Sequence, residues 1–193
     1  MFQQLYVRQA LQEGIDQIGI VDTLFHHLAV AETGQLVAKP STPFYDPQLN
    51  KVLYPYDPAR GKTLLEKHGW HLSHGVMTKD GVKLAFTFDY ASGDTTYTDI
   101  AQLFKQGWAQ EGIQVTLKSL PVNNVLTLTE GYSWNMALWC GGTPSWTYVP
   151  DYFPSGTGLF TQGGAANPGD YYSGKMTAIL NQGMSPAERA VCL

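Results

Sequence analysis

Apolar residues recur at three- and four-residue steps near the start of the chain, which is the spacing of one helix face. A helix that begins near Leu5 would place these residues together: Val7, Ala10, Leu11, Ile15 and Ile18. Because glycine is unfavourable inside a helix, we expect a break near Gly14 or Gly19, and then a second helix over residues 20–27. Prolines at positions 40, 43, 47 and 55 predict a long irregular surface segment after it.

The dipeptide Asp57-Pro58 predicts the start of another helix. The Asp57 carboxylate can accept hydrogen bonds from free backbone N–H groups, and proline is tolerated in the first turn because its missing donor would be unpaired there anyway. Leu64 and Leu65 supply the apolar face. Gly69 suits the left-handed position that ends a helix, so we expect this element to cover about residues 58–68.

A strand, a helix and a second strand are predicted between residues 83 and 120. A tight turn at residues 79–81 leads into an alternating apolar pattern, which is typical of a strand: Leu84, Phe86, Phe88 and Tyr90. The helix that follows has these residues on its apolar face: Ile100, Leu103, Phe104 and Trp108. Gly112 ends that helix before an alternating strand over residues 115–119. Such a unit predicts two parallel strands with a right-handed crossover.

A third strand is expected over residues 134–140, which are nearly all apolar and therefore typical of a strand buried on both faces in the middle of a sheet. Residues 141–170 are rich in glycine, proline and aromatic residues, and a last short helix is expected near residues 175–180. The pattern as a whole predicts an α/β fold with a mixed open sheet flanked by helices, in a single domain over residues 1–193.

Charge is scarce: Asp, Glu, Lys and Arg make up 15% of the 193 residues, where about 25% is typical. The net charge is -4, and the 12 Lys and Arg residues form no stripe, which argues against nucleic-acid binding and against polybasic membrane attachment. Aromatic residues reach 12%, enough to offer stacking surfaces to an uncharged or zwitterionic ligand.

No apolar run is long enough to span a membrane. Cys140 and Cys192 lack CxxC spacing, and their pairing stays open.

Four blocks of the sequence, in order, resemble family 5 of the extracytoplasmic solute-binding proteins, the peptide- and nickel-binding receptors of ABC importers. The first block is Tyr6-Val7-Arg8-Gln9-Ala10-Leu11 with Ile15-Asp16. The second is Tyr56-Asp57-Pro58-Ala59 with residues 64–70. The third joins Asp80-Gly81 to residues 101–102 and 112–115, and the fourth joins residues 134–139 to Pro150-Asp151-Tyr152-Phe153.

The resemblance implies the C-terminal lobe of a two-lobed periplasmic-binding-protein-like fold, with the first lobe absent and the chain ending before it returns to that lobe. It implies an extracytoplasmic protein, either periplasmic or a cell-surface lipoprotein, with the signal sequence outside this chain. The implied partners are a small, peptide-like solute and the ABC permease subunits of the intact receptor. No cofactor is implied.

The same resemblance places ligand in a cleft lined by the stretch that follows the third strand. The residues it implies are Trp139, Cys140, Gly141, Gly142 and Thr143, and in the next loop Trp146, Tyr148, Asp151 and Tyr152. Glycine there would let a ligand approach the backbone. Two alternatives stay open: Trp139 is a core residue beside a glycine turn, or the loop aromatics fold over the lobe's own core.

One departure from the family pattern bears on the ligand. Many peptide receptors of the family carry an acidic residue shortly after the tryptophan of that strand, where it pairs with the α-amino group of the peptide. This chain has Gly141-Gly142-Thr143-Pro144-Ser145 instead, and its nearest acid, Asp151, matches a separate position. A neutral, cationic or glycosidic ligand therefore stays open beside a free-amine peptide.

His68, His71 and His74 are the weak candidates for a metal site, because imidazole suits nickel and zinc. Gly69 interrupts the helix after His68, so the three histidines need not share a face, and we expect no metal site.

We expect no enzyme either, because the GxSxG, HExxH and GxxxxGK[ST] motifs are missing. The alternatives are a nickel-binding member of the same family and a freestanding carbohydrate- or protein-binding module.

Overall fold

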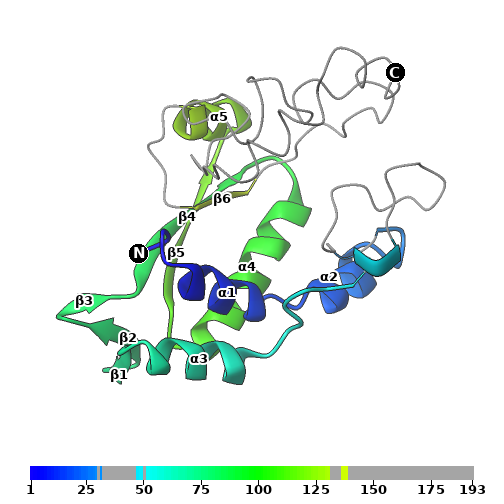
Figure 1. Cartoon of the computed structure of the whole chain (residues 1–193). Helices are drawn as coiled ribbons and strands as arrows, with labels where there is room; N and C mark the ends of the chain where they lie inside the picture. The colour runs from blue at the N-terminus through cyan, green and yellow to red at the C-terminus, as the bar shows by residue number, and fades with distance from the viewer. Residues whose placement is uncertain (30, 32–46, 50, 131–135, 139–193) are drawn as a thin grey trace, which may run out of the picture. The chain divides into compact units, whose positions relative to one another are not determined.

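The computed structural model describes residues 1–29, 31, 47–49, 51–130 and 136–138. The chain divides into two compact units, one formed by residues 1–125 and 134–139, the other by residues 126–133 and 140–193. Nearly all described elements belong to the first unit. The described residues are drawn as coloured ribbon in Figure 1. The expected short helix near residues 175–180 and most of the proline-rich segment lie outside the described residues, although a 3-10 turn, η1, covers Pro47–Leu49.

Two helices form the start of the chain. Helix α1 spans Leu5–Glu13 and ends at Gly14, which confirms the predicted break. Helix α2 spans Gln17–Leu24 and begins three residues earlier than expected, because the Asp16 side chain accepts a hydrogen bond from the backbone N–H of Gly19 at 2.9 Å. The prediction was wrong for Ile18, which lies on α2 and is exposed.

Helix α3 spans Pro58–Lys67, as the Asp57-Pro58 signal predicts. The Asp57 Oδ1 atom accepts from the backbone N–H of Arg60 at 3.0 Å. Gly69 has a φ of +88°, the left-handed conformation expected where the helix ends. Leu65 is fully buried and anchors α3 in the core.

The strand, helix and strand between residues 83 and 120 form a parallel unit, as predicted. Strand β4 spans Ala85–Ala91, helix α4 spans Thr95–Gln110 and strand β5 spans Gln114–Leu120. Strand β4 pairs in parallel with β5, and also with β6, which spans Met136–Leu138. The order is therefore β5-β4-β6, and among the described strands the middle one is β4, not the segment 134–140 that its apolar character suggested.

A small antiparallel sheet, missed by the sequence patterns, joins α3 to β4. It consists of β1 (His71–Ser73), β2 (Val76–Lys79) and β3 (Val82–Lys83). Each strand is too short for alternation to stand out. Its second turn is the predicted one: Asp80 and Gly81 both have positive φ, the conformation of a two-residue hairpin. The α/β class is confirmed, with the described strands shared between one parallel and one antiparallel sheet.

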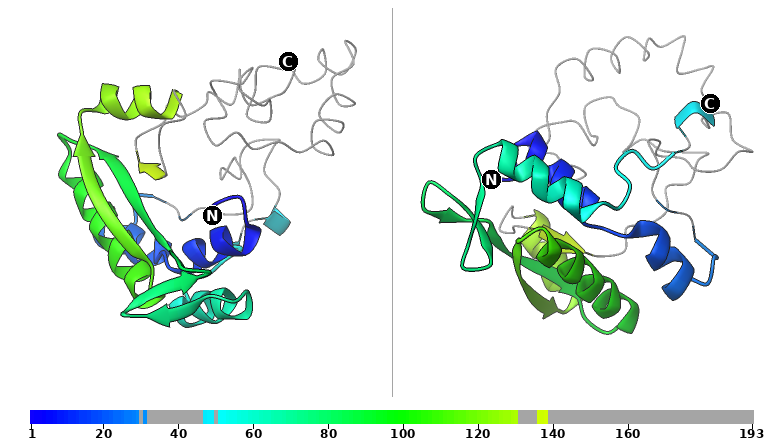
Figure 2. Two further views of the ribbon diagram at one scale, coloured as in Figure 1. Left: turned by 90° about the vertical axis from the view of Figure 1, so that its left-hand side faces the viewer. Right: turned by 90° about the horizontal axis from the view of Figure 1, so that it is seen from below.

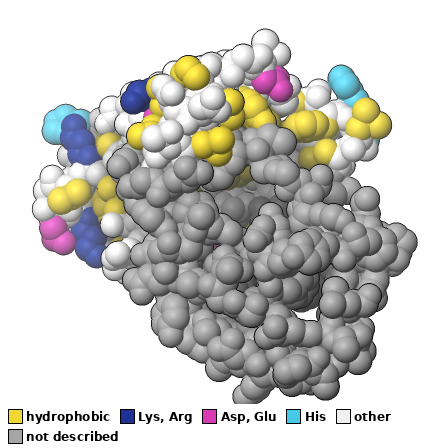
Figure 3. Space-filling view, turned by 90° about the horizontal axis from the view of Figure 1, so that it is seen from above, with side chains coloured by type: hydrophobic (Ala, Val, Ile, Leu, Met, Phe, Trp, Pro, Cys, Tyr) yellow, Lys and Arg dark blue, Asp and Glu magenta, His cyan; other side chains and the backbone are white. Residues whose placement is uncertain are grey.

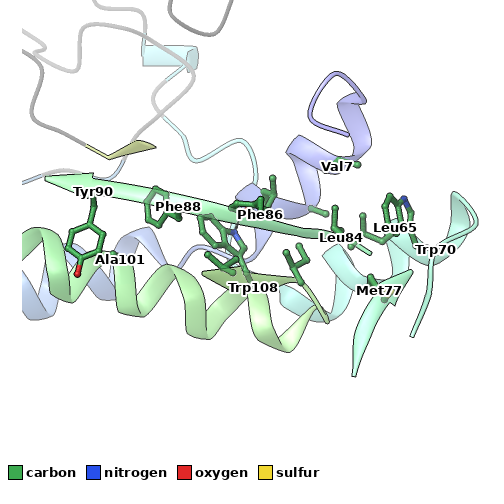
Figure 4. Close-up of a cluster of buried hydrophobic side chains, with 14 residues drawn as sticks. Val7, Leu65, Trp70, Met77, Leu84, Phe86, Phe88, Tyr90, Ala101 and Trp108 are labelled. Atoms are coloured by element: carbon green, nitrogen blue, oxygen red, sulfur yellow. Dashed lines mark hydrogen bonds between the residues drawn. The ribbon is translucent and has the colours of Figure 1, made fainter. Parts of the chain in front are cut away.

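Helix α4 lies along strand β4 (Figure 2), and side chains from both elements form the centre of the hydrophobic core (Figure 4). Trp108, fully buried on α4, makes edge-to-face contacts with Phe86 and Phe88 on β4 at centroid distances of 5.6 and 5.5 Å. Helix α1 adds Val7, Ala10 and Leu11 to the same cluster. The prediction was wrong for Leu103, which was expected on the buried face of α4 and is exposed, while Ala101 is buried there.

Candidate functional site

The described strands of the parallel sheet end together at one edge, which we call the carboxyl edge. Ala91 at the end of β4 pairs with Leu120 at the end of β5, and Tyr90 pairs with Leu138 at the end of β6. In open α/β sheets, ligands bind outside the carboxyl ends of the strands. The carboxyl edge is therefore the candidate functional site of the first unit.

The loop after β4 is fixed to the end of β5. The backbone N–H of Ser92 donates to the carbonyl of Leu120 at 2.7 Å. Gly93 follows with a φ of +98°, and the space beside its Cα is open. The Asp94 side chain then accepts from the backbone N–H of Thr96 at 2.8 Å and starts α4. This loop presents small, exposed residues at the carboxyl edge.

The loop after β5 turns at once into helix α5, which spans Val122–Glu130. The Pro121 carbonyl accepts from the backbone N–H groups of Asn124 at 2.9 Å and Val125 at 3.2 Å. Val125 is fully buried, whereas Val122 is exposed. The first turn of α5 thus forms a second rim of the carboxyl edge.

Asp89 is a buried carboxylate two residues before the end of β4, and the sequence patterns missed it. Alternation places it on the opposite face of the strand from Phe88 and Tyr90, where a polar residue is expected to be exposed. The structure instead buries Asp89, which lies opposite Lys118 of β5 in the strand register, and its Oδ1 atom has no hydrogen-bond partner among the described residues. The one sequence feature that could have indicated the burial of Asp89 is that it is the single charged residue in a mostly apolar strand.

The ligand-binding residues expected from the sequence lie outside the described residues: Trp139, Cys140, Gly141, Gly142, Thr143, Trp146, Tyr148 and Asp151. Their assignment stays a prediction. The structure does describe the strand that leads to them, because Trp139 follows Leu138, the last residue of β6, in the sequence.

The three histidines considered as metal ligands lie at the opposite end of the parallel sheet, and each is exposed. The His68 ring stacks on Tyr6 with a centroid distance of 3.9 Å. His71 lies on β1, and His74 occupies the hairpin turn with a positive φ, its Nδ1 atom 3.2 Å from the Ser73 hydroxyl. In the part of the chain that the structure describes, His, Cys, Asp and Glu residues form no group of three or more that could hold a metal ion.

On the face of the described residues that Figure 3 shows, Lys, Arg, Asp and Glu side chains lie in small groups separated by uncharged ones. Among the described residues, the helices fall short of the length and apolar character that a membrane span requires.

Comparison with known proteins identifies relatives along most of the chain. The family model described as bacterial extracellular solute-binding proteins, family 5 Middle, matches residues 1–164. The nickel-binding periplasmic protein of Escherichia coli (strain K12) is 31% identical over 119 residues, which is 59% of this chain and 21% of that protein. The oligopeptide-binding protein AppA of Bacillus subtilis (strain 168) is 27% identical over 120 residues, which is 60% of this chain and 21% of that protein.

Solved structures show the same fold. AppA from Bacillus subtilis in complex with a nonapeptide matches with a TM-score of 0.77 at 21% identity, covering 99% of this chain and 38% of that one. NikZ from Campylobacter jejuni in complex with Ni(L-His) matches with a TM-score of 0.76 at 23% identity, covering 98% of this chain and 38% of that one. The matched part of the chain covers 21% of the length of each of these two curated relatives, so the chain spans well under half the length of the proteins it resembles.

Proposed function

Because the chain belongs to family 5 of the bacterial extracellular solute-binding proteins, we propose that it is the C-terminal lobe of a receptor that captures an oligopeptide or a related small solute for an ABC importer. The observation that supports this most is the carboxyl edge. There, β6 runs parallel to β4 and leads directly into Trp139 and the glycines that follow it.

The work of such a lobe is capture without chemistry. Solute held between this lobe and a first lobe favours the closed receptor, and the closed receptor docks on the permease subunits at the membrane. A ligand shifts that equilibrium only by as much as it prefers the closed form over the open one. The isolated lobe therefore binds its solute weakly. The proposed location is extracytoplasmic, in the periplasm or on the cell surface.

The proposed ligand contacts are backbone groups and aromatic side chains. An extended peptide can pair its main chain with exposed protein backbone, which gives affinity with little dependence on side-chain identity. Gly141 and Gly142 would permit that close approach, and Trp139, Trp146 and Tyr148 would offer stacking faces. Cys140, Thr143 and Asp151 complete the proposed set.

A nickel chelate is the second candidate, favoured by the 31% identity to a nickel-binding periplasmic protein. His68, His71 and His74 do not converge, so a metal that depends on those three ligands fits poorly. A chelate brings its own ligands and needs from the protein mainly a shaped, neutral cleft. Such a solute would use the same carboxyl edge as a peptide.

Titration followed by two-dimensional 15N NMR of the 193-residue chain tests the proposal. One arm adds a mixture of short peptides and the other adds Ni²⁺ with L-histidine. We expect small, fast-exchange shifts at Ser92, Gly93 and Leu120. The amides of β1 and β2 serve as the control, because the Met77 N–H donates to the Gly112 carbonyl and the Leu84 N–H donates to the Met77 carbonyl, which places this sheet beside the amino ends of β5 and β4.

Three outcomes would contradict parts of the proposal. Shifts confined to β1 and β2 would place any ligand away from the carboxyl edge. No shift with either ligand at saturating concentration would remove the support for both solutes. Binding in the micromolar range would show that one lobe suffices and that closure between two lobes is not needed for affinity.

A further inference from the structure

Two glutamates are buried side by side where three helices meet. Glu13 is the last residue of α1, and Glu111 directly follows the last residue of α4. Their relative exposures are 1% and 0%, although glutamate is among the residues least often buried. Helix α3 forms the third side of this junction, which we call the Glu13–Glu111 junction.

Glycines on two helices enclose the Glu111 side chain. A Cβ atom built on Gly61 of α3 would overlap Oε1 of Glu111. A Cβ atom built on Gly14, at the end of α1, would lie 3.0 Å from the same oxygen and 2.7 Å from Cδ1 of Trp108. The carboxyl group therefore lies directly against helix backbone, in space that only glycine leaves free.

The charges around the pair are poorly balanced. Arg60 Nε lies 3.2 Å from Oε1 of Glu13, but the Arg60 side chain is 60% exposed, so water screens this ion pair. Asp57, at the start of α3, adds a further negative charge. Oε2 of Glu13 and both carboxyl oxygens of Glu111 are buried, and within the part of the chain that the structure describes they have no hydrogen-bond partner.

Two ionised carboxylates are disfavoured in this setting by burial and by their mutual repulsion. Burial, and to a lesser extent the charge of Glu13, raises the pKa of Glu111 to about 9. Burial also raises the pKa of Glu13, while Arg60 opposes that rise and Asp57 adds to it. Among the described residues Glu13 has a cationic partner, Arg60, and Glu111 has none, so Glu111 is the acid that stays neutral.

We propose that Glu111 is a proton-binding site within the Glu13–Glu111 junction, where it holds a proton at neutral pH, and that loss of this proton loosens the contact between α1, α3 and α4. The ligand is the proton itself, supplied by solvent. The proposal does not depend on the identity of the transported solute, because the junction lies in the helical layer at the opposite end of α4 from the carboxyl edge.

The direction of the pH effect follows from linkage. The folded chain binds the proton of Glu111 more tightly than the unfolded chain, whose pKa is near the ordinary value of 4.5. The folded state therefore holds more protons between that value and about 9. The contribution of this group to stability is complete below the unfolded pKa and decreases as pH rises through this window.

The variant Glu111→Gln tests the proposal, because an amide has the size and neutrality of the protonated acid. Its melting temperature should exceed that of the parent chain by roughly 3 °C or more near pH 8.5, with a difference close to zero near pH 5. Glu66→Gln, on the exposed face of α3, is the matched control and should leave the pH profile unchanged. Equal profiles for Glu111→Gln and the parent would overturn the proposal.

Direct observation of the carboxyl group provides a second test that needs no variant to fold. In the parent chain, the side-chain 13C resonance of Glu111 should have the shift of a protonated carboxyl near neutral pH. A chemical shift typical of an ionised carboxylate near neutral pH would refute the proposal. A third outcome would also refute the proposal. If Na⁺ or Ca²⁺ raised the melting temperature only in alkaline solution and only when Glu111 is present, the site would bind a metal cation and not a proton.

Discussion

Trp108 and Leu11 are joined by a hydrogen bond between residues 97 positions apart: the indole Nε1 donates to the Leu11 carbonyl at 2.8 Å. Leu11 lies in the last turn of α1, where carbonyl groups lack partners within the helix. The same indole ring packs on Phe86 and Phe88. One side chain therefore connects α1, α4 and the central described strand.

Replacing Trp108 by Phe should lower the free energy of unfolding by about 2–4 kcal/mol, because a buried carbonyl loses its donor and the smaller ring leaves a cavity. Urea denaturation followed by circular dichroism measures this. Trp70→Phe is the matched control: Trp70 is also buried, but its indole donates to the Tyr6 hydroxyl at a longer 3.3 Å. An equal or larger loss for Trp70→Phe would contradict the assigned role of Trp108.

Gly107 lies where α4 passes close to the backbone at the end of α1. A Cβ atom built on Gly107 would overlap the backbone carbonyl oxygen of Gly14, which cannot turn away as a side chain would. Gly107→Ala should therefore destabilise the chain by about 1–3 kcal/mol, even though alanine is the better helix former by about 1 kcal/mol.

The control for that variant is Gln106→Ala, one residue earlier on the exposed side of α4. Its free energy of unfolding should change by less than about 0.5 kcal/mol. Thermal melts of both variants give the comparison. If Gly107→Ala were as stable as the parent, the close approach of α1 and α4 would not be rigid.

Features set by local chemistry were predictable from the sequence, and those set by tertiary contacts were not. Asp57-Pro58, Asp80-Gly81 and Gly112 mark helix ends and a turn through their own backbone preferences, and the structure confirms each. Nothing near Glu111 in the sequence shows that glycines of α1 and α3 will enclose it. The parallel pairing of β4 with β5 could be predicted, because a helix lies between them in the sequence. The order β5-β4-β6 could not, because it depends on contacts with β6, which is far away in the chain.

The same division applies to the candidate site. The carboxyl edge follows from parallel strands, so its position was implied by the predicted strand, helix and strand. The burial of Asp89 was not implied by the sequence. Alternation alone assigns Asp89 to the face of β4 opposite Phe88, where polar side chains are expected to be exposed. The residues expected to contact ligand were inferred from a family resemblance, and they lie beyond the end of β6.

The N-cap of α3 makes a separate prediction. Asp57→Ala removes the acceptor for the Arg60 N–H and should lower the free energy of unfolding by about 1 kcal/mol. Asp57→Asn keeps an acceptor oxygen, so its free energy of unfolding should decrease much less. Denaturant titration near neutral pH measures both, and an equal loss would indicate that charge, not the cap hydrogen bond, is responsible.

The histidines give a test of the metal question that does not require knowledge of the solute. Because His68, His71 and His74 do not converge, replacing all three by Ala should leave any shift of the melting temperature by NiCl₂ unchanged. The substitutions themselves should cost little, roughly 0.5–1.5 kcal/mol for the stacking of His68 on Tyr6. His26→Ala with His27→Ala is the control pair, since both are exposed and distant in sequence. A nickel-induced shift that disappears in the triple variant but survives in the control pair would show that the three histidines bind the metal after all.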